Sequence, residues 1–418
     1  MSFIFDDLLR SMFGGEKLQK LAAPVITCEN DVVTMTGSGT IRYTTDLTTP
    51  NENSTVYTSP ITILQDTTFK AYCSAPGMAD SDVTTYLAVC SPDMEETYFY
   101  VEDASGQQNQ FYIDGYANAP SVTVYYSTDK TRWYELGTTG ETRIYTFIPA
   151  NGKIFLRATA NTWGSYSNQN YANHINCQYD YNVGGNVMSL IYGSNFIGQT
   201  ELKAAYSFAQ LFYNTTVTPN TKLKDISKLR LPATTLKNGC YEEMFYNCTA
   251  ITSIPDNFLP SMVAMHYCYH FMFGNCTGLV NVQSNLLPAT TIVSGCYYGM
   301  FQGCTSLKNA PSLPATDLDV YCYQQMFKGC TSLTQAPVLP APTLVNKDFC
   351  YNSMFEGCSS LKNLTCLATT GISGGNYATT NWLKTVGSNG TFTKAANATD
   401  WNRGASGIPT SWTIVDAS

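Results

Sequence analysis

The sequence predicts a multidomain α+β protein in which two β-rich modules precede an array of stacked repeats. The strongest indication is a Cys-Tyr-x-x-Met-Phe-x-x-Cys segment that begins at Cys240 and recurs from Cys268, Cys296, Cys322 and Cys350. Its period of 26 to 28 residues is typical of repeats that bury their apolar faces only by stacking. With 418 residues, of which 44% are hydrophobic and 13% charged, the chain is long enough for about three domains.

Residues 1–20 form the first predicted element, an amphipathic docking helix that ends at Gly14-Gly15. A helix this short is marginal in water, so its apolar face is expected to pack either on the same chain or on a larger assembly. Asp6 and Asp7 interrupt the segment and no basic region precedes it, which argues against a secretory signal peptide. Its apolar residues follow the helical spacing i, i+3, i+4, i+7, i+8 and are Phe5, Leu8, Leu9, Met12 and Phe13.

Residues 21–91 and 92–185 predict two small β-sandwiches. In the first, a strand-like run at residues 41–46 is followed by a turn signal at Thr49-Pro50. The second module repeats the pattern, since residues 122–129 parallel residues 41–46 and residues 154–158 parallel residues 68–71. The segment 41–82 resembles the chitobiase C-terminal-type β-sandwich modules that accompany carbohydrate-active and surface proteins. That resemblance implies an accessory module without catalysis.

Residues 186–370 contain about five or six repeats, each predicted to form a helix, a short strand and a turn. Cys322, Met326, Cys330 and Leu333 fall at i, i+4, i+8 and i+11, which would place them on one stripe of an α-helix. The following stretch contains prolines that exclude a helix but suit a sheet edge. Residues 371–418 are predicted to cap the last repeat with Phe392, Trp401, Trp412 and Ile414.

The repeats resemble the BspA-like leucine-rich repeats of bacterial surface proteins, in which a Phe-x-x-Cys-x-x-Leu core recurs. Residues 327–333, with the sequence Phe-Lys-Gly-Cys-Thr-Ser-Leu, carry this core, and Phe301 and Phe355 begin equivalent segments. The tail around residues 390–394 and 407–413 is similar to the one that closes BspA-like proteins of gut bacteria and their phages. The resemblance implies a leucine-rich-repeat solenoid.

The repeats also contain ten of the 15 cysteines of the chain. Two positions eight apart on a helix are separated by roughly 12 Å at a rise of 1.5 Å per residue, which excludes a disulfide within a repeat. We expect buried free thiols that pack as small apolar side chains, which suits folding in a reducing cytoplasm. Pairing between neighbouring repeats stays open at this point. The ten are Cys240, Cys248, Cys268, Cys276, Cys296, Cys304, Cys322, Cys330, Cys350 and Cys358.

The sequence offers little catalytic chemistry, and we expect neither an enzyme nor a cofactor or metal. His266 and His270 have the i, i+4 spacing of zinc ligands but lack a third ligand and a general base, so a solvated helix face is expected there. No Cys-x-x-Cys pair occurs. The net charge of -8 argues against a nucleic-acid partner, and no apolar stretch approaches the ~20 residues of a membrane span.

The predicted ligand surface is a row of short polar side chains on the strand face of the repeats. Stacking would place these side chains beside one another, so that they could bind a ligand or could equally form a solvated sheet face. The candidate residues are Thr252, Asn281, Asn309, Gln335 and Asn363.

Together these features predict a non-enzymatic virion structural protein of a phage of gut bacteria, a head or tail fibre or decoration. The N-terminal peptide would bind other virion proteins, and the repeats, present in many copies, would bind a host surface glycan or outer-membrane protein. The expected location is the virion surface after assembly in the host cytoplasm. A bacterial cell-surface adhesin, or an accessory carbohydrate-binding protein, is the alternative, and either would require an export signal.

Overall fold

The computed structural model divides the chain into two compact units, residues 1–93 and 94–418. It describes residues 18–417 apart from 30–31, 47, 63–66, 89–96, 116–117, 141–142, 165–171, 214–218, 373–376, 400 and 405. The predicted docking helix, with Phe5, Leu8, Leu9, Met12 and Phe13, lies outside the described residues.

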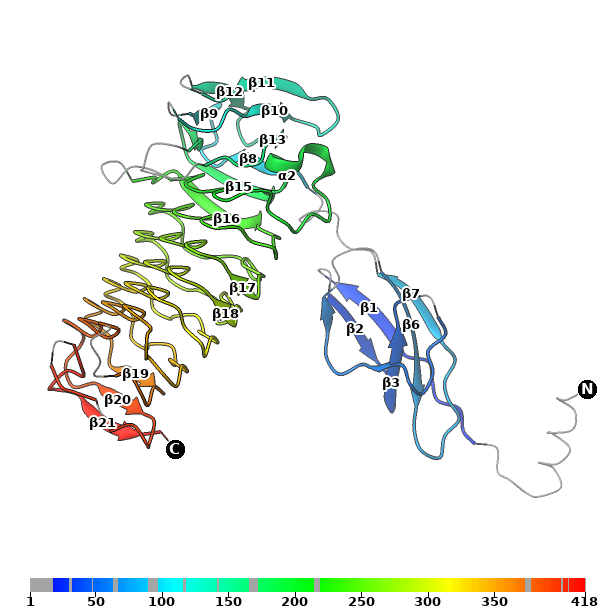
Figure 1. Cartoon of the computed structure of the whole chain (residues 1–418). Coiled ribbons are helices and arrows are strands. Elements are labelled where there is room, and N and C mark those ends of the chain that lie inside the picture. Colours follow the sequence, from blue (N-terminus) through cyan, green and yellow to red (C-terminus); the bar gives the residue numbers. More distant parts are fainter. Residues whose placement is uncertain are drawn as a thin grey trace, which may run out of the picture. The chain divides into compact units, whose positions relative to one another are not determined.

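The first unit is built from two antiparallel sheets that share one apolar core (Figure 1). Alternating strand residues point into this core, among them Val33 and Met35 of one sheet and Phe69, Ala71 and Cys73 of the other. This packing is that of a small β-sandwich. The three-stranded sheet has the order β1 (Val25–Glu29), β2 (Val32–Thr36), β5 (Ile61–Thr62), and the four-stranded sheet has the order β4 (Thr55–Val56), β3 (Thr40–Thr44), β6 (Thr67–Ser74), β7 (Thr84–Ala88).

The second unit begins with another pair of sheets. The six-stranded sheet has the order β11 (Tyr134–Thr138), β10 (Thr123–Ser127), β13 (Lys153–Ala158), β8 (Tyr100–Asp103), β15 (Tyr181–Asn186), β16 (Leu223–Arg230). The three-stranded sheet has the order β12 (Ile144–Ile148), β9 (Asn109–Asp114), β14 (His174–Cys177). A short helix, α2 (Ser189–Tyr192), and a 3-10 turn, η1 (Gly193–Asn195), follow β15.

The pairing of β15 with β16 joins the second β module to the repeats. β8 and β15 are antiparallel, whereas β15 and β16 are parallel. From β16 onward the repeats stack in the same direction, and one hydrophobic core runs from Phe99 in the module to Trp412 near the C-terminus. The array therefore continues the sheet of the module and its core.

Each Cys-to-Cys segment in the array is a run of tight turns. Within the run from Cys240, the amide of Met244 donates to the carbonyl of Tyr241 and the amide of Cys248 to that of Phe245, three residues back. The intervening amides donate to the next repeat instead, from Tyr241 to Cys268 and from Phe245 to Met272. Alternate amides thus close turns and tie neighbouring repeats together, so every main-chain donor of the run is satisfied.

The turn runs require a left-handed backbone at every fourth residue. In the first full run these residues are Gly239, Glu243 and Asn247, with φ of 60°, 51° and 61°. Glycine and asparagine tolerate this conformation best, and several equivalent positions in later repeats are glycine. The four-residue period places the apolar residues of each run on the inner side of the turns.

The predicted α+β class and the solenoid of helical leucine-rich repeats are therefore wrong. Among the described residues, the only α-helix is α2, and strands and turns are the main elements. The spacing of Cys322, Met326 and Cys330 repeats every four residues without drift, whereas an α-helix turns by 3.6 residues. That exact four-residue period belongs to consecutive turns and not to a helical stripe.

Short parallel strands lie on the side of the array opposite the turn runs (Figure 1). β17 (Val263–Ala264) pairs with β18 (Thr291–Ile292), and β19 (Asn363–Cys366), β20 (Thr391–Lys394) and β21 (Thr413–Asp416) form a three-stranded sheet at the C-terminal end. Phe392 and Trp412 are buried at this end, and Trp401 and Ile414 pack against the core.

Candidate functional site

The structure brings most of the predicted ligand-surface residues into one exposed row. Parallel β-bridges connect Ser253 with Asn281, Asn309 with Gln335, and Gln335 with Asn363. All five of these side chains are exposed. Ser253, and not the predicted Thr252, occupies this row, because the amide of Val280 bonds to the carbonyl of Thr252 and so aligns Thr252 with Val280. We call Ser253, Asn281, Asn309, Gln335 and Asn363 the polar row.

The polar row extends beyond the repeats into the C-terminal sheet. Asn363 pairs with Thr391, and Thr391 pairs with Thr413. Within the row, the Asn309 amide Nδ2 donates to the carbonyl of Val282 at 2.7 Å. Asn309 is thus used partly to brace two repeats, whereas the side chains of Asn281, Gln335 and Asn363 make no hydrogen bond within the described part of the chain. Their amide groups are available to a ligand.

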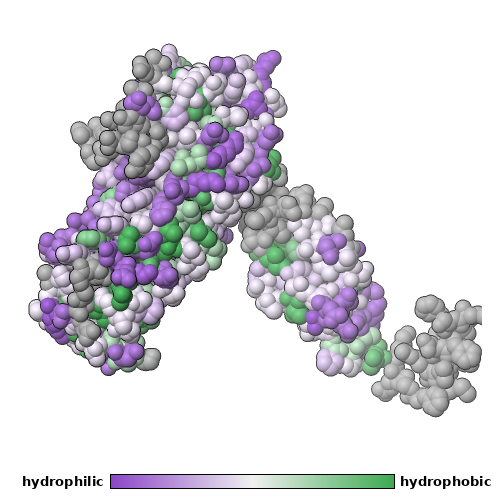
Figure 2. All heavy atoms as spheres, viewed as in Figure 1, coloured by the Kyte–Doolittle hydropathy of each residue, from purple (hydrophilic) through white to green (hydrophobic). Residues whose placement is uncertain are grey.

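Hydrophobic and hydrophilic residues intermix on the face of the array seen in Figure 2. Exposed apolar side chains of the array include Met262, Val263, Val338 and Val345. Exposed lysines, Lys308 and Lys362, directly precede Asn309 and Asn363 of the polar row. Such a mixed surface suits recognition through many weak contacts.

The ten repeat cysteines occupy two buried columns, and none of them is in a disulfide. In the second column the thiols donate to a carbonyl of the preceding repeat, for example Cys304 Sγ to Phe273 O at 3.1 Å and Cys358 Sγ to Phe327 O at 3.0 Å. Burial raises the pKa of the Cys304 and Cys322 thiols to about 12. These thiols are therefore protonated and unreactive at neutral pH.

The two neighbouring histidines lie in a turn run and not on a helix face. His270 Nδ1 lies 2.8 Å from Glu242 Oε1, and its ring packs near that of Tyr298 with centroids 4.9 Å apart. His266 is exposed. No group of three potential metal ligands occurs among the described residues.

Aromatic residues form two kinds of columns along the array. The inner columns are buried and stack in register, for example Tyr297 on Tyr323 at 5.8 Å with planes 5° apart. They belong to the core, as their recurrence predicts.

A second, outer column was not predicted and consists of Tyr321, Phe349 and Tyr377. Neighbouring ring centroids lie 5.3 Å apart in both pairs, with planes inclined by 10° and 13°. All three residues have a left-handed backbone, with φ of 58°, 55° and 54°. This is the left-handed position that every turn run contains, and a bulky residue there costs roughly 1–3 kcal/mol. We call these three residues the outer stack.

The sequence contains a signal for the outer stack. Tyr321 and Phe349 directly precede the first cysteine of their repeats, and Tyr377 follows Phe349 by a full period of 28 residues. The same position is glycine before Cys240 and Cys296. Where the position is Gly295, the ring of Tyr267 from the preceding repeat fills the space that a Cβ would take, with Cε1 2.3 Å from it. Three successive aromatic residues at one repeat position, with glycine at that position in an earlier repeat, thus mark the column.

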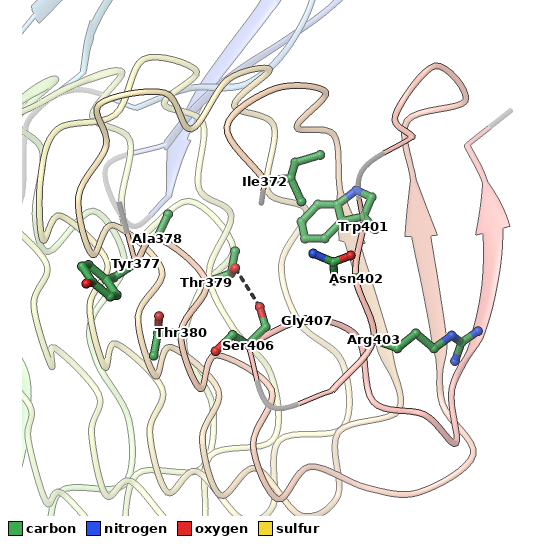
Figure 3. Close-up of a pocket in the computed structure, with 10 residues that line it drawn as sticks. All are labelled: Ile372, Tyr377, Ala378, Thr379, Thr380, Trp401, Asn402, Arg403, Ser406 and Gly407. Atoms are coloured by element: carbon green, nitrogen blue, oxygen red, sulfur yellow. Dashed lines mark hydrogen bonds between the residues drawn. The ribbon is translucent and has the colours of Figure 1, made fainter. Parts of the chain in front are cut away.

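The outer stack ends at a pocket of about 270 Å³ near the C-terminus (Figure 3). Tyr377 belongs both to the stack and to the pocket lining, and its side chain is 59% exposed. Trp401, on another wall, stacks on the buried Trp382 at 5.3 Å. The remaining lining is mostly small and polar and consists of Ile372, Ala378, Thr379, Thr380, Asn402, Arg403, Ser406 and Gly407.

Comparison with known proteins assigns one segment of the chain. A family model described as Fn3 associated matches residues 32–86, which lie within the first β module. The curated proteins contain no match to this chain. No helix among the described residues is long and apolar enough to cross a membrane.

Proposed function

We propose that this protein is a non-enzymatic recognition protein that binds the surface of a host cell through its repeat array. The observation that carries the proposal is the polar row, which places exposed amides of successive repeats side by side. Regularly spaced hydrogen-bonding groups suit an extended ligand with repeating hydroxyl groups, such as a surface glycan. Low affinity per chain would be compensated by many copies on one particle.

The particle that we favour is a virion of a phage of gut bacteria, in which the protein serves as a fibre or decoration and contacts other virion proteins. The resemblance of the repeats and the tail to BspA-like proteins supports this proposal, together with ten buried cysteines that suit a reducing compartment. A bacterial cell-surface adhesin is the second candidate. The Fn3-associated match at residues 32–86 is compatible both with a virion protein and with an adhesin. Detection of the chain in purified phage particles, or in washed cell envelopes of uninfected bacteria, distinguishes the two.

Adsorption of the full chain to host cells tests the proposed function. Beads that carry many copies of the protein should adsorb, and replacement of Asn281, Gln335 and Asn363 by Ala should reduce adsorption by roughly tenfold or more. Each replacement removes two amide donors and one acceptor from the row. Because a bead binds through many copies at once, a small loss of affinity in each copy produces a large loss of adsorption. The full chain is required because β15 and β16 join the module and the array in one sheet.

The matched control replaces Thr277, Thr305 and Ser359 by Ala. These side chains are also exposed and polar and also recur along the array. They lie four residues before Asn281, Asn309 and Asn363 of the polar row. The control should adsorb like the unmodified protein. Failure of the unmodified beads to adsorb, or equal adsorption by the two triple variants, contradicts the proposal.

A further inference from the structure

Among the described residues, the outer stack ends at Tyr377, which is 59% exposed. Phe349 covers one face of Tyr377, and among the described residues no other ring contacts Tyr377. Inside the stack, neighbouring rings at 5.3 Å cover the faces of one another and leave mainly edges to solvent. Only a terminal ring can offer a whole face to a ligand, and Tyr377 does so where the pocket begins.

The described residues about one period after Tyr377 are Gly404, Ser406 and Gly407, which are small. Thr379 Oγ1 donates to the carbonyl of Ser406 at 2.9 Å, which ties this loop to the repeat that contains Tyr377 (Figure 3). Ser406 and Gly407 both line the pocket. The stack therefore ends in a hollow and not in another ring.

Apart from Arg403, the polar side chains of the pocket lining are neutral. The hydroxyls of Thr380 and Ser406 and the side-chain amide of Asn402 make no hydrogen bond within the described part of the chain. Arg403 is the only charged residue of the lining, and its guanidinium points away from the other lining side chains (Figure 3). Its NH1 donates to the carbonyls of Pro409, Thr410 and Trp412.

We propose that this pocket binds one neutral pyranose ring, which stacks on Tyr377 and donates and accepts hydrogen bonds at Thr380 and Ser406. A flat aromatic face beside hydroxyl groups is complementary to a sugar, which has an apolar C–H face and a polar rim. A volume of about 270 Å³ is near the lower end for small-molecule sites and suits a single ring. The inference rests on the proposed glycan recognition and adds a second, separate contact site to the polar row.

Saturation-transfer NMR with the full chain tests the pocket. The probes are the methyl glycosides of glucose, galactose and mannose, with methyl glucuronide as the charged comparison. At least one neutral probe should bind, and Tyr377→Ala should raise its Kd roughly tenfold, which corresponds to about 1.4 kcal/mol. Tyr377→Phe keeps the ring and should change Kd by less than about twofold. Tyr145→Ala removes a tyrosine of similar exposure, 56%, from β12 and should leave Kd unchanged.

Binding of no neutral probe overturns the inference, as does an unaltered Kd in Tyr377→Ala or tighter binding of the glucuronide. If Tyr377→Ala does not fold, the double variant Thr380→Val, Ser406→Ala serves instead and should weaken binding. Cell adsorption separates this inference from the proposed function. Sugar binding without adsorption of the beads refutes the proposed function alone, whereas adsorption without sugar binding refutes the pocket alone.

Discussion

The two cysteines of one repeat have different surroundings although both are fully buried. Cys304 Sγ donates to the Phe273 carbonyl at 3.1 Å, whereas the Cys296 thiol donates to no acceptor within the described part of the chain and only receives hydrogen bonds from the backbone around Val293 and Tyr297. A serine at position 304 would inherit an acceptor, and a serine at position 296 would bury a hydroxyl without one. The second cysteine column is therefore more than an apolar filler.

We expect Cys296→Ser to lower the free energy of unfolding by roughly 1–3 kcal/mol, the cost of burying a hydroxyl that has no acceptor. Cys304→Ser should cost less than about 1 kcal/mol because the Phe273 carbonyl accepts the new hydroxyl. Urea unfolding of both variants measures the difference. Equal losses in the two variants would show that the thiol-to-carbonyl bond has no energetic role.

At the scale of elements, the turn runs depend on residues that tolerate a left-handed backbone. Gly299 has a φ of 59°, and a Cβ built on it would lie 2.3 Å from Cε1 of Phe271. Gly329 has a φ of 76°, but the nearest atom to its Cβ would be 3.8 Å away. The two glycines thus share the backbone requirement and differ in the space around them.

Replacement of either glycine by Ala should therefore destabilise the protein, but by different amounts. Gly329→Ala introduces only the backbone strain, about 1–2 kcal/mol. Gly299→Ala must also displace the Phe271 ring, which adds roughly 1–3 kcal/mol. Thermal unfolding monitored by circular dichroism provides the comparison. If the Gly299→Ala variant were as stable as Gly329→Ala, displacement of the Phe271 ring would have no energetic cost.

The sequence predicts the repeat period and the buried residues better than the element type. Cys322, Met326 and Cys330 are inward-facing as expected, but a four-residue period differs from a helical one by only 0.4 residue per turn, which one short segment does not reveal. Six glycines at left-handed positions of the runs were the missed signal, namely Gly239, Gly295, Gly299, Gly303, Gly329 and Gly357.

The candidate surfaces were predictable to different degrees. The polar row was found with an error of one residue at Thr252, because the exact start of a strand depends on pairing with a neighbouring repeat. Tyr321 and Phe349 recur with the period, but nothing local to them predicts the pocket. That pocket forms where Tyr377 meets residues more than 20 positions further along the chain.

At the scale of the whole molecule, the array has no independent start. β15 and β16 share a sheet, and the core of the module continues to the C-terminal sheet. Stability of such a stack is expected to be a sum of repeat and neighbour contributions. Unfolding is thus expected to begin at the C-terminal end of the array, because the N-terminal end is continuous with the β module.

The rows of main-chain bonds between repeats also determine how the protein responds to force. Tension between the two ends of the chain would detach one repeat at a time, because each repeat is tied only to its neighbours. A released repeat of 28 residues would lengthen the chain by roughly 90–100 Å. Single-molecule pulling should record successive steps of this size, and a single large step would contradict it. A protein with this property that attaches a particle to a cell would unfold one repeat at a time under flow and stay bound while it lengthens.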